Sequence, residues 1–200
     1  SGRPGPVVLD FAKNAQTGMV EFEPAKVDFI RSYDPEPDMN LTDIERAAKM
    51  INNSVKPFVL VGQGVELGSA QKELCTFLVL SDIPCGTTFL GLSAIPSDHR
   101  LNMGILGMHG NLGPNVMTNQ CDLLIAVGMR FDDRVTGNLA TYAKQAKIIH
   151  FDIDPAEFNK NVTVDLAVLG NCKETLPAVT KMMDKAQHTS WIGGFKPYEE

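Results

Sequence analysis

Short apolar runs that alternate with stretches of helical periodicity constrain the fold of this 200-residue chain more than any other feature. The runs have the length of strands, and three of them end directly before a glycine. Strands that are apolar on both faces are typical of parallel sheets covered by helices on each side. The alternation therefore predicts an α/β fold, a doubly wound parallel sheet of about five or six strands with helices on both faces. The predicted strands are residues 58–61, 83–87, 123–127, 148–151 and 167–169.

Helical signals lie between these runs. Thr42 and Glu45 have the spacing of a capping box, and apolar residues recur every three or four positions from Leu41 to Ile51. This pattern predicts a helix of about three turns. The other expected helices span residues 70–78, begin near Pro114, begin at Asp154–Pro155, and run from the cap residue Asn171 to about Met183.

The two ends of the chain differ from its middle. Residues 1–38 contain five prolines and one short apolar run, Val7 to Leu9. We interpret residues 1–38 as the end of a preceding domain, an incoming strand followed by a linker. Residues 39–186 are predicted to form a central nucleotide-binding domain. Periodicity is lost over residues 187–200, which are expected to be a tail or a linker.

Composition and missing motifs narrow the class of protein. Acidic residues outnumber basic ones by 24 to 18, and no Lys/Arg-rich run occurs, so we expect no nucleic-acid partner. No apolar run approaches the ~20 residues that cross a bilayer, so we expect no membrane association and a cytoplasmic protein. The four cysteines form no C-x-x-C pair, which predicts reduced, mostly buried thiols. No hydrolase triad order, H-E-x-x-H or P-loop pattern is found, so no catalytic or metal-binding residue is predicted.

In a doubly wound sheet ligands bind beyond the carboxyl ends of the strands, so the residues after each run are the candidate site. The first such turn, Gly62 to Gly68, has the form G-x-G-x-x-x-G. It lacks the spacing of the dinucleotide fingerprint, and Cys85 to Thr87 stand where that fingerprint needs an acid. These glycines are therefore interpreted as turn formers.

Three further turns carry polar groups. Gly107 to Gly110 precede a helix whose N–H groups could bind phosphate, or they form a plain helix-entry loop. Gly128 to Gly137 hold two arginines and two aspartates, which form either a phosphate-binding fork or a solvated loop. Asp152 ends a strand and suits a ribose diol, whereas Asp154 suits a helix cap. Together these loops predict a site for a nucleotide with a pyrophosphate.

The same residues resemble a known family. Gly107 to Gly110, Ala126 to Gly137 with the string R-F-D-D-R-V-T-G, and Ile148 to Asp152 are similar to the central domain of acetohydroxyacid (acetolactate) synthase catalytic subunits. Ser1 to Asp10 resemble the end of that enzyme's first domain. The resemblance covers about residues 1–185, and the fold it implies is the Rossmann-like central domain of thiamine-diphosphate enzymes.

The resemblance implies an enzyme of branched-chain amino-acid biosynthesis that decarboxylates pyruvate and joins the two-carbon unit to a second 2-keto acid. Thiamine diphosphate and Mg²⁺ would be bound by other domains, and FAD would lie across this domain without net redox change. The family forms oligomers and can bind a regulatory subunit. The FAD contacts implied by the motifs are Arg3, Thr87, Thr88, Met108, His109, Gly110, Gly128, Met129, Arg130, Asp132, Arg134, Val135, Asp152, Ile153 and Asn171.

Two departures and several alternatives accompany this hypothesis. Asn171 stands where the family usually has Asp, and the family's third-domain metal motif and first-domain glutamate are absent. The chain is therefore expected to be an inactive fragment of the enzyme. The alternatives are the central domain of another FAD-containing thiamine-diphosphate enzyme, a flavin electron-transfer module, a sirtuin-like deacylase, which normally carries a C-x-x-C pair, and a ligand-free structural domain.

Overall fold

The computed structural model describes residues 3–24, 26, 35–195 and 198. Over this part of the chain it contains one six-stranded parallel sheet in the order β3-β2-β1-β4-β5-β6. This order is that of a doubly wound fold, with the direction of winding reversed between β1 and β4. The predicted fold class is thus confirmed. The strands are β1 (Pro57–Val61), β2 (Cys85–Thr87), β3 (Asn102–Ile105), β4 (Leu123–Val127), β5 (Lys147–Asp152) and β6 (Leu166–Leu169).

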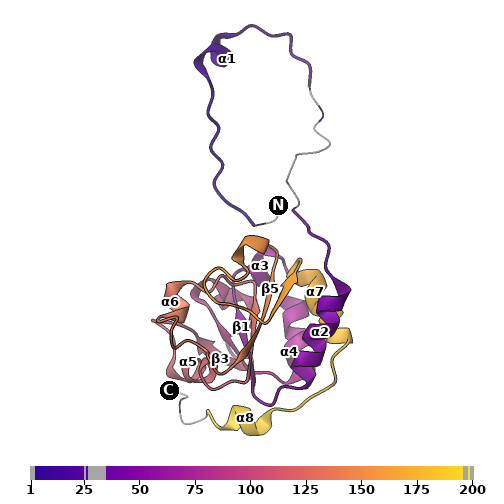
Figure 1. The fold of residues 1–200 in the computed structure, drawn as a ribbon, viewed down its shortest axis with the longest axis vertical. Coiled ribbons are helices and arrows are strands. Elements are labelled where there is room, and N and C mark those ends of the chain that lie inside the picture. Colours follow the sequence, from indigo (N-terminus) through magenta and orange to yellow (C-terminus); the bar gives the residue numbers. More distant parts are fainter. Residues whose placement is uncertain (1–2, 25, 27–34, 196–197, 199–200) are drawn as a thin grey trace.

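Helices cover both faces of the sheet (Figure 1). Side chains alternate between the faces along each strand, so that Val59 packs on one side and Phe58 on the other. The first face is covered by α2 (Leu41–Asn52), α4 (Gln71–Ser81) and α7 (Cys172–Lys181), and the second by α5 (Leu112–Thr118) and α8 (Thr189–Gly193). The remaining short elements are α1 (Lys13–Thr17), α3 (Gly64–Leu67), η1 (Phe89–Ala94), α6 (Asp133–Thr136) and η2 (Pro155–Glu157).

Two local predictions differ from the structure. The cap of α2 is Asn40, whose side chain accepts a hydrogen bond from the Thr42 N–H at 2.9 Å, so the helix begins one position before the predicted capping box. The edge strand β3 was not predicted. It is only half-buried and contains Gly104 at φ +108°, and therefore lacks the continuous apolar run of a central strand.

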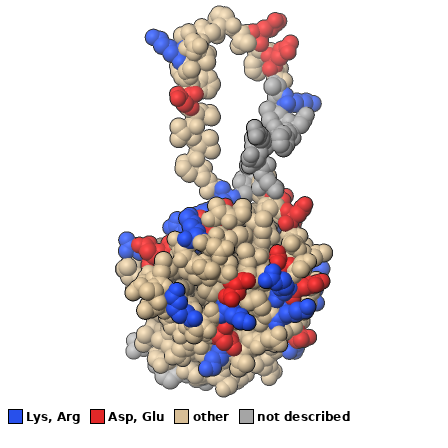
Figure 2. Space-filling model, viewed as in Figure 1, with Lys and Arg blue, Asp and Glu red and all other residues tan. Residues whose placement is uncertain are grey.

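The amino-terminal segment forms no strand among the described residues, and its assignment to a preceding domain stays a prediction. Val7 to Leu9 pair with no strand among the described residues, and they are 78–90% exposed. Figure 1 shows that this arm arches away from the sheet, and Figure 2 shows both basic and acidic side chains along it. A strand needs a neighbouring strand to take its hydrogen bonds, and the described residues offer none here. Part of the predicted linker, residues 25 and 27–34, lies outside the described residues.

The carboxyl-terminal segment packs on the domain. Trp191 of α8 is 9% exposed, its indole N–H donates to the Pro57 carbonyl at 2.9 Å, and its ring meets Phe195 edge-to-face. The segment thus covers the second face beneath β1. The sequence pattern did not reveal this helix, because residues 189–195 contain only three large apolar residues, Trp191, Ile192 and Phe195.

The remaining global features are simple. Basic and acidic side chains are interspersed over the domain face seen in Figure 2. None of the helices in the described part of the chain has the length and apolar character needed to span a bilayer. Cys85, Cys121 and Cys172 are buried, Cys75 is half-buried and all four are free, which confirms the predicted mostly buried thiols.

Candidate functional site

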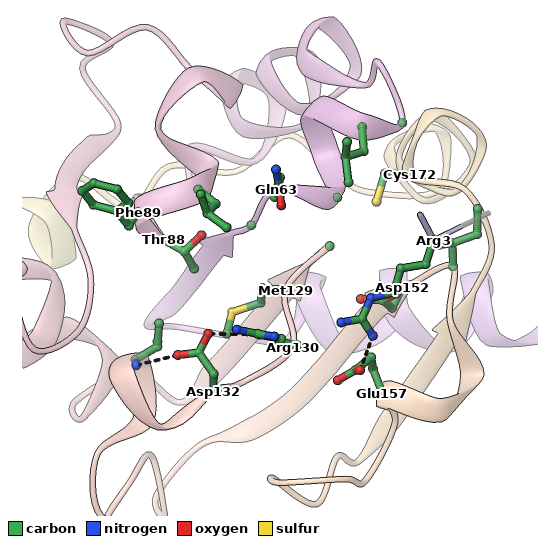
Figure 3. A pocket seen from close by; sticks show the side chains of 18 of the residues that line it. Arg3, Gln63, Thr88, Phe89, Met129, Arg130, Asp132, Asp152, Glu157 and Cys172 are labelled. Atoms are coloured by element: carbon green, nitrogen blue, oxygen red, sulfur yellow. Dashed lines mark hydrogen bonds and ion pairs between the residues drawn. The ribbon is translucent and has the colours of Figure 1, made fainter. Parts of the chain in front are cut away.

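A cavity of about 810 Å³ opens beyond the carboxyl ends of the strands, where the fold places ligands (Figure 3). Its volume lies in the upper part of the ~300–1,000 Å³ range of small-molecule and cofactor sites. Every strand of the sheet contributes residues from the turn that follows it. Predicted site residues that line the cavity are Arg3, Thr88, Met108, His109, Gly128, Met129, Arg130, Asp132, Arg134, Val135, Asp152, Ile153 and Asn171.

Glycines allow the turns after β1 and β4 to touch at the centre of the cavity. Gly62 N–H donates to the Val127 carbonyl and Gly64 N–H to the Gly128 carbonyl, both at 2.9 Å. A Cβ on Gly64 would lie 2.6 Å from Gly128 Cα, and one on Gly62 would lie 2.2 Å from the Gly128 oxygen. The backbone approach requires Gly62 and Gly64, in keeping with their interpretation as turn formers, and both glycines also line the cavity.

The turn after β4 is held by Asp132. Its carboxylate caps α6 by accepting from the Arg134 N–H at 3.0 Å and the Val135 N–H at 3.3 Å, and it also accepts from Arg130 Nε at 3.2 Å. Among the described residues the Arg134 side chain forms no ion pair, and its one hydrogen-bond partner is Met108 Sδ, at 3.9 Å. Asp132 therefore shapes the loop, while Arg134 presents an uncompensated cation to the cavity.

The turn after β3 is joined to the turn after β4. Met108 N–H donates to the Arg134 carbonyl at 2.8 Å. Gly107 adopts φ +93°, and a Cβ at this position would lie 2.4 Å from the same carbonyl oxygen. Met108 and His109 are exposed at the cavity. Gly110 and the start of α5 do not line it, and a Cβ on Gly110 would lie 2.3 Å from the Ile105 oxygen. In this structure Gly110 packs against backbone, and the start of that helix, for which phosphate binding and a plain entry loop were both open, does not line the cavity.

The end of β2 contributes one predicted residue and two that sequence reasoning missed. Thr88 lines the cavity, whereas Thr87 is buried beneath it, 1% exposed. The missed residues are Phe89 and Leu90 of η1, which line the cavity although they are 73% and 59% exposed. Two large apolar residues directly after a strand were the available signal.

At the end of β5 Asp152 is almost fully buried, at 8% exposure. Its Oδ1 accepts from the Asp154 N–H at 2.9 Å, and its Oδ2 lies 3.5 Å from Nε2 of the buried His150. The same His150 nitrogen lies 2.7 Å from the Met129 carbonyl oxygen, so His150 links the turns after β4 and β5. Sequence reasoning missed His150 because it stands within an apolar strand. Asp154 caps η2 as predicted, since it accepts from the Ala156 N–H at 3.0 Å.

Arg3 reaches the cavity from the amino-terminal arm. Its Nη1 contacts Asp154 Oδ2 at 3.0 Å and Glu157 Oε1, an oxygen that Lys160 Nζ also contacts at 2.9 Å. Burial opposes ionisation of Glu157, but the hydrogen bonds from Arg3 and Lys160 outweigh it and hold the pKa of Glu157 below its usual value. Glu157 also lines the cavity, and it was not predicted.

Asn171 and Cys172 form the wall after β6. Asn171 accepts from the Lys173 N–H at 3.0 Å and so caps α7, a role that Asn and Asp fill about equally well. A Cβ on Gly68 would lie 2.8 Å from Asn171 Oδ1, so the cap also touches the turn after α3. Burial raises the pKa of the Cys172 thiol to about 12, which leaves it protonated and unreactive near neutral pH.

The arrangement suits binding better than catalysis. Two arginines come from the turn after β4 and a third from the amino-terminal arm, a buried carboxylate ends β5, and apolar side chains line the β2 and β3 side. Among residues 3–24, 26, 35–195 and 198, His, Cys, Asp and Glu side chains form no group of three that could hold a metal ion. The set matches a ligand with phosphates, hydroxyl groups and an aromatic system.

Comparisons with known proteins agree with this geometry. Residues 44–179 match the family model described as "Thiamine pyrophosphate enzyme, central domain". The chain is 44% identical over 180 residues to a probable acetolactate synthase large subunit of Methanocaldococcus jannaschii, covering 88% of this chain and 30% of that protein. It is 43% identical to the acetolactate synthase large subunit of Corynebacterium glutamicum, with 88% and 28% covered. It is 40% identical to the acetolactate synthase isozyme 2 large subunit of Escherichia coli, with 92% and 33% covered.

The chain thus spans about a third of the length of these relatives. The similarity to these relatives extends over most of the chain. The region that matches the family model contains all six strands of the sheet. A doubly wound sheet, a nucleotide-sized cavity at its carboxyl edge and the family match all lead to one assignment. The chain belongs to the thiamine pyrophosphate enzyme family, as its central domain.

Proposed function

We propose that this domain binds FAD across the carboxyl edge of its sheet, as the central part of an acetolactate synthase large subunit. The observation that carries the proposal is the cavity to which all six strand ends contribute, with Arg130 and Arg134 reaching it from the turn after β4 and Arg3 from the amino-terminal arm. Arginine forks bind phosphate oxygens in two-point contacts, so these side chains fit a pyrophosphate. Asp152 fits a ribose hydroxyl, and the exposed Phe89 and Met108 fit the face of a flavin ring.

The activity proposed for the complete protein is the decarboxylation of pyruvate and the transfer of the two-carbon unit to a second 2-keto acid. Thiamine diphosphate supplies the carbanion chemistry of that reaction when it is bound, with Mg²⁺ holding its diphosphate. In this proposal other domains hold both, while this domain positions FAD. The whole protein would be a cytoplasmic homo-oligomer, and the words "large subunit" in the relatives' names suggest a regulatory partner.

FAD binding is tested directly on this chain. Titration with the chain should quench flavin fluorescence, and FAD should remain with the protein through desalting at high protein concentration. Because part of a truncated site and its preorganisation are lost, we expect weaker binding than in a three-domain protein. Absence of saturable quenching, or equal affinity for FAD and for adenosine alone, would contradict the proposal.

The fragment and electron-transfer alternatives have separate tests. With thiamine diphosphate, Mg²⁺, FAD and pyruvate, the isolated chain should form no acetolactate, and reproducible formation would overturn the assignment of the reaction to other domains. A flavin electron-transfer module would require the bound FAD to cycle between redox states during turnover. Stopped-flow absorbance of the complete enzyme should show oxidised flavin throughout.

A further inference from the structure

Glu157 is a buried carboxylate at the wall of the cavity. It is the last residue of η2, and its side chain is 2% exposed. Two cations, Arg3 Nη1 and Lys160 Nζ, contact the same oxygen, Oε1. The second oxygen, Oε2, is buried without a hydrogen-bond partner in the described part of the chain. Because an ionised carboxylate is costly to bury unless it is paired, Glu157 needs its cations in place.

Arg3 in turn has little else to hold it near the domain. It precedes the exposed arm in which Val7 to Leu9 are 78–90% exposed, and its other ion pair is with the partly exposed Asp154. Both contacts use Nη1, so the remaining N–H groups of the guanidinium bond to none of the described residues. Figure 3 shows the Arg3 guanidinium above Glu157 and beside Asp152 at the edge of the cavity.

We propose that Glu157 is a positioning residue that anchors Arg3 at the carboxyl ends of β5 and β6, so that its remaining donors meet oxygens of the bound nucleotide. The proposal rests on the proposed FAD site. Its physical content is that a desolvated carboxylate fixes one edge of a planar guanidinium and thereby orients the others. Glu157 then affects nucleotide affinity only through Arg3, whereas a purely structural Glu157 would act through Lys160 and the turn at residues 155–160.

A double-mutant cycle separates these roles. FAD affinity is measured by fluorescence titration for Arg3→Ala, Glu157→Gln, the double variant and the matched control Lys160→Gln, which removes the other cation from Oε1. Loss of one charge-assisted contact should weaken binding about 10-fold or more in Arg3→Ala, and about 3- to 10-fold in Glu157→Gln, where Asp154 still pairs with Arg3. The double variant should match Arg3→Ala, and Lys160→Gln should match the wild type.

Two outcomes of the cycle would overturn the proposal. One is a double variant weakened by the product of the two single effects, which is the signature of independent sites. The other is Lys160→Gln reproducing the loss seen in Glu157→Gln. Thermal melts of all variants identify any that fail to fold, and Glu157→Asp provides a variant that keeps the charge and should recover part of the affinity.

A second measurement needs no FAD. In the nitrogen-15-labelled chain, the guanidinium N–H resonances of Arg3 should be protected from exchange in the wild type and in Lys160→Gln, and should broaden in Glu157→Gln. Identical Arg3 signals in wild type and Glu157→Gln would refute the anchor. If the wild type binds no FAD, the proposed function fails, while this measurement still decides whether Glu157 holds Arg3.

Discussion

Replacing Gly64 by Ala should destabilise the chain, although alanine is the better helix former at this first position of α3. The added Cβ would lie 2.6 Å from Gly128 Cα, 3.0 Å from its oxygen and 3.1 Å from its carbonyl carbon. Carbon atoms that are not bonded prefer separations of about 3.5–4.0 Å. All three atoms belong to backbone, and the Gly128 N–H is bonded to the Phe151 carbonyl at 2.8 Å, so the β4 turn cannot yield without disturbing β5.

The size of the effect follows from two opposing contributions. Overpacking costs about 1–3 kcal/mol, whereas Gly→Ala in a helix interior gains at most about 1 kcal/mol. The gain is smaller at a first helical position, so we expect a net loss of about 1–2 kcal/mol. The matched control is Gly193→Ala in α8, where no heavy atom lies within 4 Å and the change should be neutral or stabilising by up to ~1 kcal/mol.

Urea unfolding followed by circular dichroism measures both variants. With a slope of about 1–3 kcal/mol/M, the midpoint of Gly64→Ala should fall by about 0.3–2 M at an unchanged slope. FAD affinity should fall as well, because Gly64 and Gly128 shape the centre of the cavity. If Gly64→Ala were as stable as Gly193→Ala, the turns after β1 and β4 would not be in contact, and the packing explanation of these glycines would be wrong.

Three further predictions concern the site and the core. Arg130→Ala and Arg134→Ala should each weaken FAD binding by about 10- to 150-fold, with Arg134 at the upper end because no carboxylate of the described residues pairs with it. Binding isotherms should show a smaller difference from the wild type at high salt than at low salt, and unchanged affinity with a lower melting temperature would make the arginines structural. The lowered pKa of Glu157 should contribute stability that is present above the unfolded pKa of about 4.3 and lost as pH falls through the lower folded value. The free energy of unfolding should therefore fall less steeply with decreasing pH in Glu157→Gln than in the wild type. Identical pH dependences in the two proteins would contradict the ion pair. Trp191→Ala should destabilise the chain by about 3–5 kcal/mol in urea unfolding, and a loss below ~1 kcal/mol would show that α8 does not cover the core.

The sequence by itself determined the central architecture. Five of the six strands were predicted, because strands such as β1 and β4, buried on both faces, need continuous apolar runs bounded by turn residues. Chain direction and the carboxyl-edge rule then placed most of the site, since parallel strands deliver their following turns to one edge. The cavity-lining positions Arg130, Arg134 and Asp152 were identified in this way from local sequence alone.

Tertiary structure decided what depends on contacts between distant segments. β3 is an edge strand stabilised by pairing with β2, and α8 is a short helix stabilised by burying Trp191 against β1, so neither carries a strong local pattern. The same holds for Gly110, which packs closely against the Ile105 backbone and does not line the cavity. Glu157 and Arg3 are 154 positions apart, and only the folded chain brings them together. A local sequence pattern indicates which face of an element is buried, but it does not indicate which distant segment packs against that face. The contact between Arg3 and Glu157 at the cavity wall depends on such a distant segment.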